Sequence, residues 1–304
     1  MAETQNLLVP ELAEPVRLDA WLAAELGSRT AAARAVKEGR VLVGNERRAK
    51  SFLLHGSESV QLTEQQVPEA RESSEQTEIP VVFEDAHLMV VEKPAGMVVH
   101  PAPGHATGTL AQILAGSLSG GEEGRAGIVH RLDQDTTGLL IVARTEDAHR
   151  QLRQMLEKRE VTRIYTALVD GAPPTKEGTI TAPIGRDRRV RTKMSTTTDT
   201  PRDATTHFTV ETAFAHSTLL TVQLETGRTH QIRVHLKTIG LPVIGDREYG
   251  IRGGLGLARQ FLHAAQLEFT HPITGEELSF TSDLPSDLDA ALARARAGEQ
   301  AVPG

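Results

Sequence analysis

The sequence predicts an α+β fold, and three observations support this prediction. The 304 residues are 39% hydrophobic, enough for one large buried core or two smaller ones. Short apolar segments typical of strands outnumber amphipathic segments typical of helices, and the two kinds do not alternate strictly as in a parallel α/β domain. Residues 63–78 lack any apolar period and predict a linker, so we expect two domains.

The first predicted domain spans residues 17–62 and follows an N-terminal tail, residues 1–16. The segment "RLDAWLAAELG" has an apolar stripe at helical spacing, and "SRTAAARAVKEGR" predicts a second helix that ends at Gly39. The segments "VLVGN" and "ESVQL" predict short strands. Cationic side chains surround the second helix at Arg29, Arg34 and Lys37. This pattern is typical of a solvated helix face, and it also fits a surface that binds phosphates.

The second predicted domain spans residues 79–290 and begins with two apolar runs around Glu84-Asp85-Ala86, a pattern typical of a hairpin. The segments "TLAQILAGSL", "DAHRQLRQMLEKRE" and "THQIRVHLKTIG" predict helices. The segment "GLLIVAR" predicts a buried strand, "RIYTALVDG" another, and "HFTVETAFAHSTLLTVQLET" a pair of strands. Residues 291–304 predict a C-terminal tail that frays.

The composition excludes several kinds of site. The chain has no cysteine, which rules out disulfides, thiolate metal sites and a cysteine nucleophile. The segment "MAETQNLLVPELAEP" has neither the basic nor the apolar region of a signal peptide. No apolar run approaches the roughly 18 residues that a membrane span requires. We therefore expect a soluble cytoplasmic protein.

Charge is distributed unevenly along the chain, whose formal net charge is −7. Residues 64–85 carry seven acidic side chains and one basic side chain, whereas residues 144–193 carry twelve basic and seven acidic side chains. A local basic face can bind phosphates even when the whole protein is acidic. The densest basic run is "RDRRVRTK", with Arg186, Arg188, Arg189, Arg191 and Lys193. It fits a solvated loop or a phosphate-binding one.

The segment "GIVHRLDQDTTGLLIVARTEDA" places charged residues between two apolar runs. Asp133 and Asp135 are two residues apart, and such a carboxylate pair can perform acid–base chemistry when one pKa is raised. The following "DTTG" is also rich in turn-forming residues, so the pair could simply shape a turn. The local pattern leaves both interpretations open.

Two further stretches contain candidate site residues. Arg233 is flanked by Ile232 and Val234, which predicts a partly buried guanidinium that needs a carboxylate partner, and Asp133 is the expected one. The alternative is a purely structural ion pair. His230 and His235 are five apart, a poor spacing for a metal on one helix face, so we expect no metal. Tyr165, one of two tyrosines, fits a core position as well as a functional one.

Taken together, these segments resemble the RluA/RluD-type family of pseudouridine synthases. The matching segments are "KPAGMVVHP", "HRLDQDTTGLLIVART", "REVTRIYTALVDG", "LETGRTHQIRVHL" with "PVIGDREYG", and "LHAAQLEFTHPITGE". They occur in the family's order over residues 79–285, and their amino-acid sequences favour the RluD-like branch. Residues 17–62 resemble the S4 RNA-binding domain, a small α/β module, although "VGNERRAKSFLLHGSES" departs from its usual C-terminal pattern.

The resemblance implies a pseudouridine synthase fold, with a mostly antiparallel mixed sheet and a central active-site cleft. It implies a cofactor-free isomerisation of specific uridines to pseudouridine in a stem-loop of large-subunit (23S) ribosomal RNA. Asp133 would be the essential carboxylate, Tyr165 would stack beneath the flipped base, and Arg233 would pair with Asp133. Arg131 would fill the gap left by the base, with His130 beside it at the RNA. Leu262 and His263 would lie at the pocket.

The implied partner is ribosomal RNA, bound by a monomer without membrane or metal. Two other classes of function remain to be compared. A ribosome-assembly factor would need the N-terminal domain and the basic face but not Asp133, Tyr165 and Arg233 together. A hydrolase of glycosidic bonds would need two carboxyl groups spaced for acid and nucleophile roles, and Asp133 and Asp135 are close in sequence for that. The chemical intermediate of the isomerisation also stays open.

Overall fold

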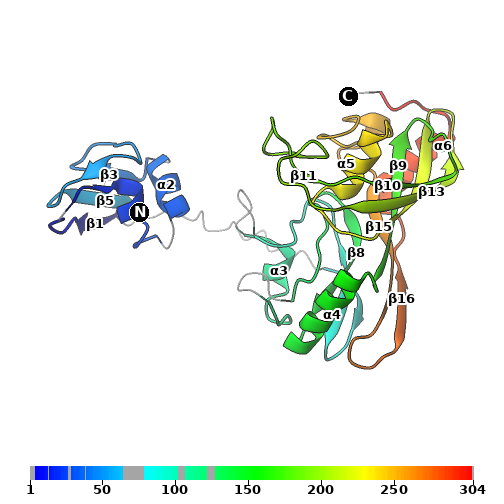
Figure 1. The fold of residues 1–304 in the computed structure, drawn as a ribbon, viewed down its shortest axis with the longest axis horizontal. Helices are drawn as coiled ribbons and strands as arrows, with labels where there is room; N and C mark the ends of the chain where they lie inside the picture. The colour runs from blue at the N-terminus through cyan, green and yellow to red at the C-terminus, as the bar shows by residue number, and fades with distance from the viewer. Residues whose placement is uncertain are drawn as a thin grey trace. The chain divides into compact units, whose positions relative to one another are not determined.

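The computed structural model describes residues 4–12, 14–26, 29–37, 39–63, 79–101, 107–121 and 127–302. The chain divides into two compact units, Met1–Glu78 and Ile79–Gly304 (Figure 1). Each unit has its own apolar core and is described by itself. Most of the predicted linker, residues 64–78, lies outside the described residues. No helix of the described ranges is long and apolar enough to cross a membrane.

The first unit is a small sheet with two helices. Strands β1 (Thr4–Leu8), β5 (Ser59–Thr63) and β3 (Val41–Val43) form an antiparallel sheet in that order, and β2 (Val16–Arg17) pairs with β4 (Leu53–Leu54). Helices α1 (Leu18–Trp21) and α2 (Arg29–Lys37) complete the unit. Its core contains the fully buried side chains of Leu18, Leu22, Leu54 and Val60. The predicted first helix is shorter than expected, because turns replace it after Trp21.

The predicted N-terminal tail is wrong for residues 4–9. Strand β1 pairs with all five residues of β5, from Thr4 opposite Thr63 to Leu8 opposite Ser59. Val9 is buried in the core of the unit, and its backbone exchanges hydrogen bonds with the Ser57–Glu58 turn. The pairing partner lies about fifty residues further along the chain, so the local pattern could not indicate it.

The second unit is built on a nine-stranded sheet. Eight strands follow the order β10-β13-β14-β9-β15-β8-β7-β6, and β16 pairs with β15. Their bounds are β6 Val81–Glu84, β7 Leu88–Lys93, β8 Thr137–Ala143, β9 Thr162–Asp170, β10 Glu177–Thr181, β13 Thr205–Ala213, β14 Ser217–Leu224, β15 Leu262–Thr270 and β16 Glu277–Thr281. Every neighbouring pair is antiparallel except β15 with β8. This mixed, mostly antiparallel sheet confirms the predicted α+β fold.

Helices flank this sheet. They are α3 (Leu110–Ile113), α4 (Glu146–Lys158), α5 (Gln231–Thr238) and α6 (Ser286–Arg296), with a short 3-10 helix at Gly254–Gly256. A two-stranded ribbon of β11 (Gly185–Arg186) and β12 (Met194–Ser195) lies apart from the sheet. Figure 1 shows α4 and α5 on opposite sides of the region where β8 and β15 are adjacent.

The central strands are buried on both faces, which explains their continuous apolar runs. In β8, Leu140 and Val142 pack into one core, whereas Leu139 and Ile141 pack into a second core that includes Leu152 of α4. Thr145 caps α4 by accepting a hydrogen bond from the Ala148 backbone nitrogen. A strand whose two faces are both covered cannot be amphipathic, so its apolar residues run without alternation.

The predicted C-terminal tail is wrong over residues 291–296 and at Ala301. Helix α6 extends to Arg296, with Leu292 and Ala295 buried in the core of the second unit, and Ala301 is also buried. The apolar residues of "SDLDAALARAR" recur at helical spacing and fix this face against the sheet. The sequence prediction gave too much weight to its position at the chain end.

Gly138 lies where β8 meets β15, directly after the charged turn of residues 133–136. Its φ is +109°, and a Cβ there would lie 2.2 Å from the Ala264 backbone oxygen. Gly96 also has a positive φ, +80°, but nothing lies within 4 Å of its Cβ position. Replacing Gly96 by alanine therefore tests the free-energy cost of the backbone conformation alone, whereas replacing Gly138 tests that cost together with the cost of a steric clash.

We predict that Gly138→Ala lowers the free energy of unfolding by about 3 kcal/mol or more, because conformational strain and a backbone clash add. Gly96→Ala is the matched control and should cost only about 1 kcal/mol, the conformational part. Urea unfolding followed by circular dichroism measures both. Equal losses for the two variants would show that the β8–β15 contact is not tightly packed.

Candidate active site

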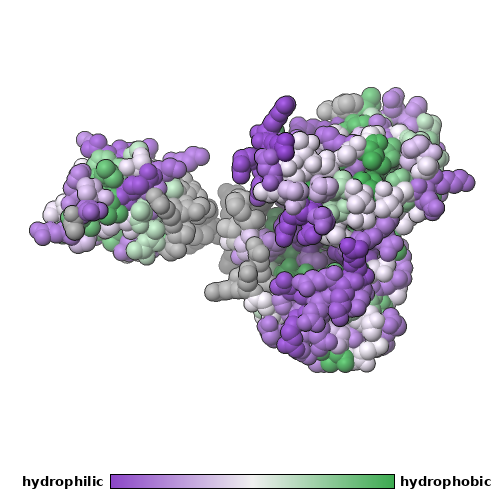
Figure 2. Space-filling view, viewed as in Figure 1, coloured by the Kyte–Doolittle hydropathy of each residue, from purple (hydrophilic) through white to green (hydrophobic). Residues whose placement is uncertain are grey.

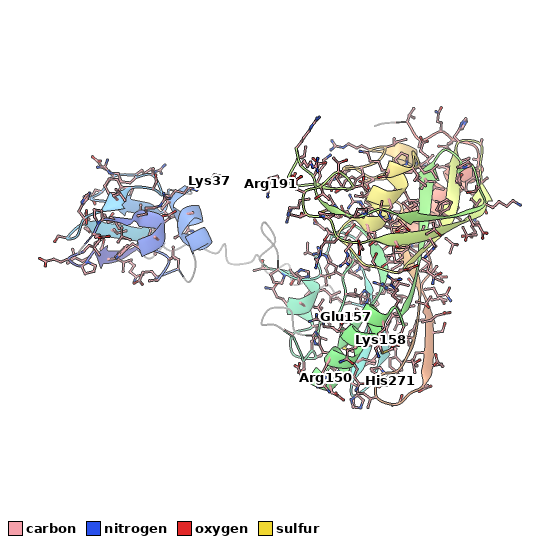
Figure 3. The ribbon with its side chains drawn as sticks, viewed as in Figure 1. Lys37, Arg150, Glu157, Lys158, Arg191 and His271 are labelled. Atoms are coloured by element: carbon pink, nitrogen blue, oxygen red, sulfur yellow. The ribbon has the colours of Figure 1, made fainter. Side chains whose placement is uncertain are left out.

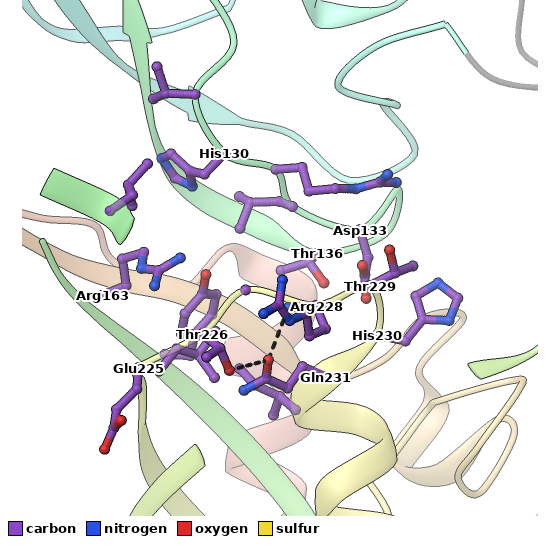
Figure 4. A pocket seen from close by; sticks show the side chains of 18 of the residues that line it. His130, Asp133, Thr136, Arg163, Glu225, Thr226, Arg228, Thr229, His230 and Gln231 are labelled. Atoms are coloured by element: carbon purple, nitrogen blue, oxygen red, sulfur yellow. Dashed lines mark hydrogen bonds between the residues drawn. The ribbon is translucent and has the colours of Figure 1, made fainter. Parts of the chain in front are cut away.

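A pocket of about 630 Å³ opens in the second unit. Its walls come from residues 128–136, from β9, from the loop 224–232 and from the C-terminal part of α4. Figure 2 shows a hollow in this unit with hydrophilic residues around it, and Figure 4 shows side chains that line the pocket. Segments far apart in the sequence therefore contribute to one site.

Asp133 lies in the turn that leads into β8. Leu132 beside it is buried, and the Thr136 backbone nitrogen donates to the Asp133 backbone oxygen at 3.1 Å, which closes the turn. The Asp133 side chain is 14% exposed and lines the pocket. Burial of the following apolar strand thus fixes the position from which this carboxylate faces the pocket.

Arg233 of α5 is buried and contacts the Asp133 side chain. Its Nη1 atom lies 3.1 Å from Asp133 Oδ2, and its Nε and Nη2 atoms donate to both oxygens of Asp246 at 2.7 and 2.9 Å. Burial disfavours its charge, but the hydrogen bonds and charges of Asp246 and Asp133 outweigh burial and hold the pKa of Arg233 above its ordinary value. The structure therefore places beside Arg233 the carboxylate expected from the sequence and two more, those of Asp246 and, at 3.5 Å, Glu248.

Asp246 was missed by the sequence analysis. Its side chain is completely buried, and its Oδ1 atom also accepts hydrogen bonds from the backbone nitrogens of Glu248 and Tyr249 at 2.9 and 3.0 Å. Burial alone would raise the pKa of Asp246, but Arg233 and these backbone donors lower it. An Asp that accepts from backbone two and three residues later is a common turn pattern, and "GDREYG" carries that signal.

Tyr165 lies on β9 with its ring in the pocket wall. The residue is 5% exposed, and burial raises the pKa of its hydroxyl, with Arg163 acting in the opposite direction and Asp133 in the same one. Leu262 of β15 lines the same wall. The apolar wall and the Asp133 side chain therefore face one space.

The prediction that His263 lies at the pocket is wrong, because His263 is not among the residues that line it. It follows Leu262 on the strand, so its side chain points to the opposite face. It is fully buried, with Nδ1 2.9 Å from Thr137 Oγ1 and Nε2 3.1 Å from the Ser282 backbone oxygen. His263 supports the strand behind the site.

Lys93 explains the segment "KPAGMVVHP". Its side chain is fully buried at the end of β7, and its amine donates to the backbone oxygens of Pro94, Met97 and Gln134 at 2.7, 2.8 and 2.8 Å. Burial lowers the pKa of this amine to about 7, against the opposing charges of Asp135 and Asp133. The three carbonyl acceptors match the three donors of the ammonium form. Lys93 thus ties the loop after β7 to the turn that contains Asp133.

His130 and Arg131 precede the turn and differ in environment. His130 Nε2 accepts a hydrogen bond from the Ile141 backbone nitrogen at 3.0 Å, and its Nδ1 atom is buried without a partner in the described part of the chain. Burial, with a smaller effect of Arg163, lowers the pKa of His130 to about 3. The His130 ring is therefore neutral near pH 7, whereas Arg131 is exposed at the pocket.

The loop 226–231 forms the wall opposite His130. The Gln231 side-chain oxygen accepts from Thr226 Oγ1 at 2.8 Å and from the Arg228 backbone nitrogen at 3.0 Å (Figure 4). His230 has a positive φ of 57°, and its Nδ1 atom lies 2.8 Å from the Tyr249 hydroxyl. These contacts fix the loop before any ligand binds.

The basic run 186–193 begins with the last residue of β11 and continues through the loop that leads to β12. Arg186, Arg188, Arg189 and Arg191 are exposed, and Arg191 projects away from the body of the second unit (Figure 3). Arg186 and Arg131 line a neighbouring hollow of about 580 Å³. Lys193 instead donates to the Glu248 backbone oxygen at 3.0 Å. The structure therefore brings Arg186, but not the whole run, to Arg131.

The remaining expected RNA contacts lie in the first unit. Lys37 is exposed at the end of α2. Arg29 and Arg34 belong to the same helix, but their side chains lie outside what the structure describes. Among the described residues, no group of three or more His, Cys, Asp or Glu side chains is arranged to hold a metal ion.

Two family models match the sequence. The model described as RNA pseudouridylate synthase matches residues 87–238, and the S4 domain model matches residues 16–60. The chain is 45% identical to the uncharacterized RNA pseudouridine synthase YlyB of Bacillus subtilis, over 90% of this chain and 91% of that protein. It is 41% identical to ribosomal large subunit pseudouridine synthase D of Pseudomonas aeruginosa, over 91% of this chain and 90% of that protein.

Solved structures resemble the second unit's fold. Human RNA pseudouridylate synthase domain containing 4 superposes with a TM-score of 0.55 and 28% identity, over 71% of this chain and 93% of that chain. Human RNA pseudouridylate synthase domain containing 1 superposes with a TM-score of 0.57 and 25% identity, over 76% of this chain and 99% of that chain.

The neutral, buried His130 generates a pH prediction. In the unfolded chain this group titrates near 6.5, but in the folded protein its pKa is about 3. The unfolded state therefore binds more protons between these values, and His130 makes stability fall as pH drops from 6.5 toward 3. His130→Gln keeps an acceptor for the Ile141 nitrogen and removes this titration.

We therefore expect the wild type to lose stability relative to His130→Gln as pH falls from 7 to 4. Above pH 7 the difference between the two proteins should be constant. Urea unfolding at a series of pH values measures it. A difference that does not change between pH 7 and pH 4 would mean that His130 takes up a proton in the folded protein.

Proposed function

The chain belongs to the RNA pseudouridylate synthase family and carries an S4 domain, and from this membership we propose that it isomerises specific uridines in a stem-loop of large-subunit (23S) ribosomal RNA. Similar proteins from Pseudomonas aeruginosa and Nitrosomonas europaea are named ribosomal large subunit pseudouridine synthase D. The alignments span nearly the full length of both chains, which supports the same substrate class here.

One observation supports the assignment of the reaction most strongly: the ion pair of Asp133 and Arg233 in a pocket walled by Tyr165. In the reaction, the N1–C1′ bond of uridine breaks and a C5–C1′ bond forms. C5 loses a proton and N1 gains one, so atoms and electrons balance without a cofactor. We assign Asp133 as the essential catalytic carboxylate, acting on ribose or base as a nucleophile or removing a sugar proton.

Each of these routes requires an ionised carboxylate. A carboxyl group in an apolar pocket would otherwise favour its neutral form. Arg233 lies 3.1 Å from Asp133 and supplies the opposing positive charge. Because Asp246 occupies the other side of the guanidinium, Arg233 is held in place and need not reorganise during the reaction.

The target base must leave its stack before it reaches Asp133, at a cost of roughly a few kcal/mol. We assign Tyr165 as the ring on which the flipped base stacks and Arg131 as the side chain that fills the gap in the RNA. Phosphate contacts of Arg186 and the neighbouring basic residues of the β11–β12 loop offset the cost of flipping. The proposal places this chemistry in the cytoplasm, in a monomer without metal or cofactor.

The two other classes of function receive less support from the site. The hydrolase hypothesis depends on Asp133 and Asp135 acting as a pair, but Asp135 does not line the pocket. The Asp135 backbone oxygen accepts from Arg259 at 3.0 Å, which fits the role of shaping the turn. An assembly factor without catalysis would not need the buried pair of Arg233 and Asp133, which is costly to desolvate.

We predict that Asp133→Asn lowers pseudouridine formation in 23S ribosomal RNA by roughly 10³-fold or more, because the isosteric amide has no ionised oxygen. RNA affinity and the melting temperature should change little. Pseudouridine mapping of ribosomal RNA from strains with and without this gene first locates the target uridines. Asp135→Asn is the matched control and should keep most activity; an active Asp133→Asn protein would refute the mechanism.

We also predict that deleting residues 1–62 weakens RNA binding or narrows the set of modified uridines without removing the chemistry. The second unit keeps its own core and the whole pocket, so activity on a short RNA stem-loop should persist. Filter binding and pseudouridine mapping measure the two effects. If neither affinity nor site choice changed, the S4 domain would have no role in substrate recognition.

A further inference from the structure

Arg163 is a buried arginine in the pocket wall that no role described above uses. It lies on β9 two residues before Tyr165, so the two side chains share one face of the strand. The residue is 6% exposed, and its Nε atom is buried without a hydrogen-bond partner. Within the described ranges, its guanidinium forms no ion pair.

Other buried arginines of the second unit differ from Arg163 in this respect. Arg233 contacts Asp133 and Asp246, and Arg259 contacts both oxygens of Asp287 at 2.6 and 2.8 Å. A buried charge without a partner costs free energy, and proteins seldom keep one without a use. An anionic ligand would remove this cost.

The carboxylates that line the pocket do not neutralise Arg163. Asp133 pairs with Arg233 and Glu157 with Arg153. Glu225 pairs with Arg159 and His207. None of these carboxylates, nor that of Asp203, lies within the 4.0 Å limit of an ion pair with Arg163. The guanidinium therefore remains available to a ligand.

His130 supplies a second unpartnered donor beside Arg163. Because His130 Nε2 accepts from the Ile141 nitrogen, the ring proton of the neutral side chain lies on Nδ1, which is buried and has no partner among the described residues. In Figure 4 the Arg163 guanidinium points toward the pocket below the His130 ring. Gly227 packs closely against the guanidinium on the other side, since a Cβ there would lie 3.0 Å from Arg163 Nη1, so a side chain at this position would press on Arg163.

We propose that Arg163 and His130 form a phosphate subsite, which binds one phosphodiester group of the RNA next to the flipped uridine. This rests on the proposed function. Two residues of strand separate Arg163 from Tyr165, roughly 6.6 Å, comparable with the step from a base to a neighbouring phosphate. A uracil oxygen is neutral and would leave the guanidinium uncompensated, whereas a phosphodiester carries the charge and accepts from both donors.

The first experiment measures the salt dependence of binding to a 23S ribosomal RNA transcript. For Arg163→Gln we expect RNA affinity to fall about tenfold and the slope of log K against log salt to become shallower by about 0.7 to 0.9, the contribution of one phosphate. Arg163→Lys should keep most of the slope. Arg150→Gln, an exposed arginine of α4 outside the pocket, is the matched control and should keep the wild-type slope.

The stability of the free protein gives a second readout. Removal of an unpaired buried charge should leave the free energy of unfolding of Arg163→Gln unchanged or higher. A purely structural arginine would give the opposite result, lower stability with an unchanged salt slope. An unchanged slope overturns the proposal whatever the stability.

A third measurement keeps the native protein and changes the RNA. Stem-loops that contain the mapped uridine are synthesised with one neutral methylphosphonate linkage on its 5′ or 3′ side. One of these two linkages should weaken wild-type binding about tenfold and leave Arg163→Gln binding unaffected. If, at both linkages, the loss of affinity from the neutral linkage and the loss from Arg163→Gln simply added together, the proposed subsite would be overturned. Pseudouridine formation by the wild type on the unmodified stem-loop tests the proposed function separately.

Discussion

The arrangement of the site depends on the buried charge of Arg233. A guanidinium buried on a helix of the second unit is costly unless carboxylates pair with it. Asp246 takes two of its nitrogens and is itself held by the backbone of the turn that follows. The remaining nitrogen contacts Asp133, which lines the pocket. The position of Asp133 is thus defined by Arg233, which is itself held by the fully buried side chain of Asp246.

The turn that carries Asp133 is fixed from the opposite side by the sheet. Lys93 donates to the Gln134 backbone oxygen, and Arg259 donates to that of Asp135. The Gln260 side chain donates to Thr136 Oγ1 at 3.2 Å. These donors come from segments on both flanks of β8, so the turn cannot shift without breaking several buried hydrogen bonds. A carboxylate held this way needs little rearrangement when substrate arrives.

Apolar patterns predicted β8, β9, α4 and α5 because each of these segments buries a run of its own residues. Strand β1 was not predicted, because its stability comes from pairing with β5 and not from local preference. The pair of Asp133 and Arg233 followed from the family resemblance and from the need to neutralise a buried arginine. Asp246 was not predicted as a site residue, because the charged residues Arg247 and Glu248 beside it are typical of a solvent-exposed turn. Its burial depends on where the loop after α5 returns to the sheet, which no local pattern specifies.

The buried arginines Arg163 and Arg233 have opposite electrostatic surroundings. The charge of Arg233 is balanced within the protein by Asp133 and Asp246, so its position does not depend on a ligand charge. Arg163 has no carboxylate partner in the described structure, and its Nε atom is buried without a hydrogen bond, a desolvation cost that the proposed phosphate would offset. That cost is returned as binding free energy, which makes a ligand phosphate bind more tightly than it would to a neutralised site. A site that must both bind a polyanion and orient a carboxylate therefore uses both kinds of arginine, one balanced by the protein and one left for the ligand.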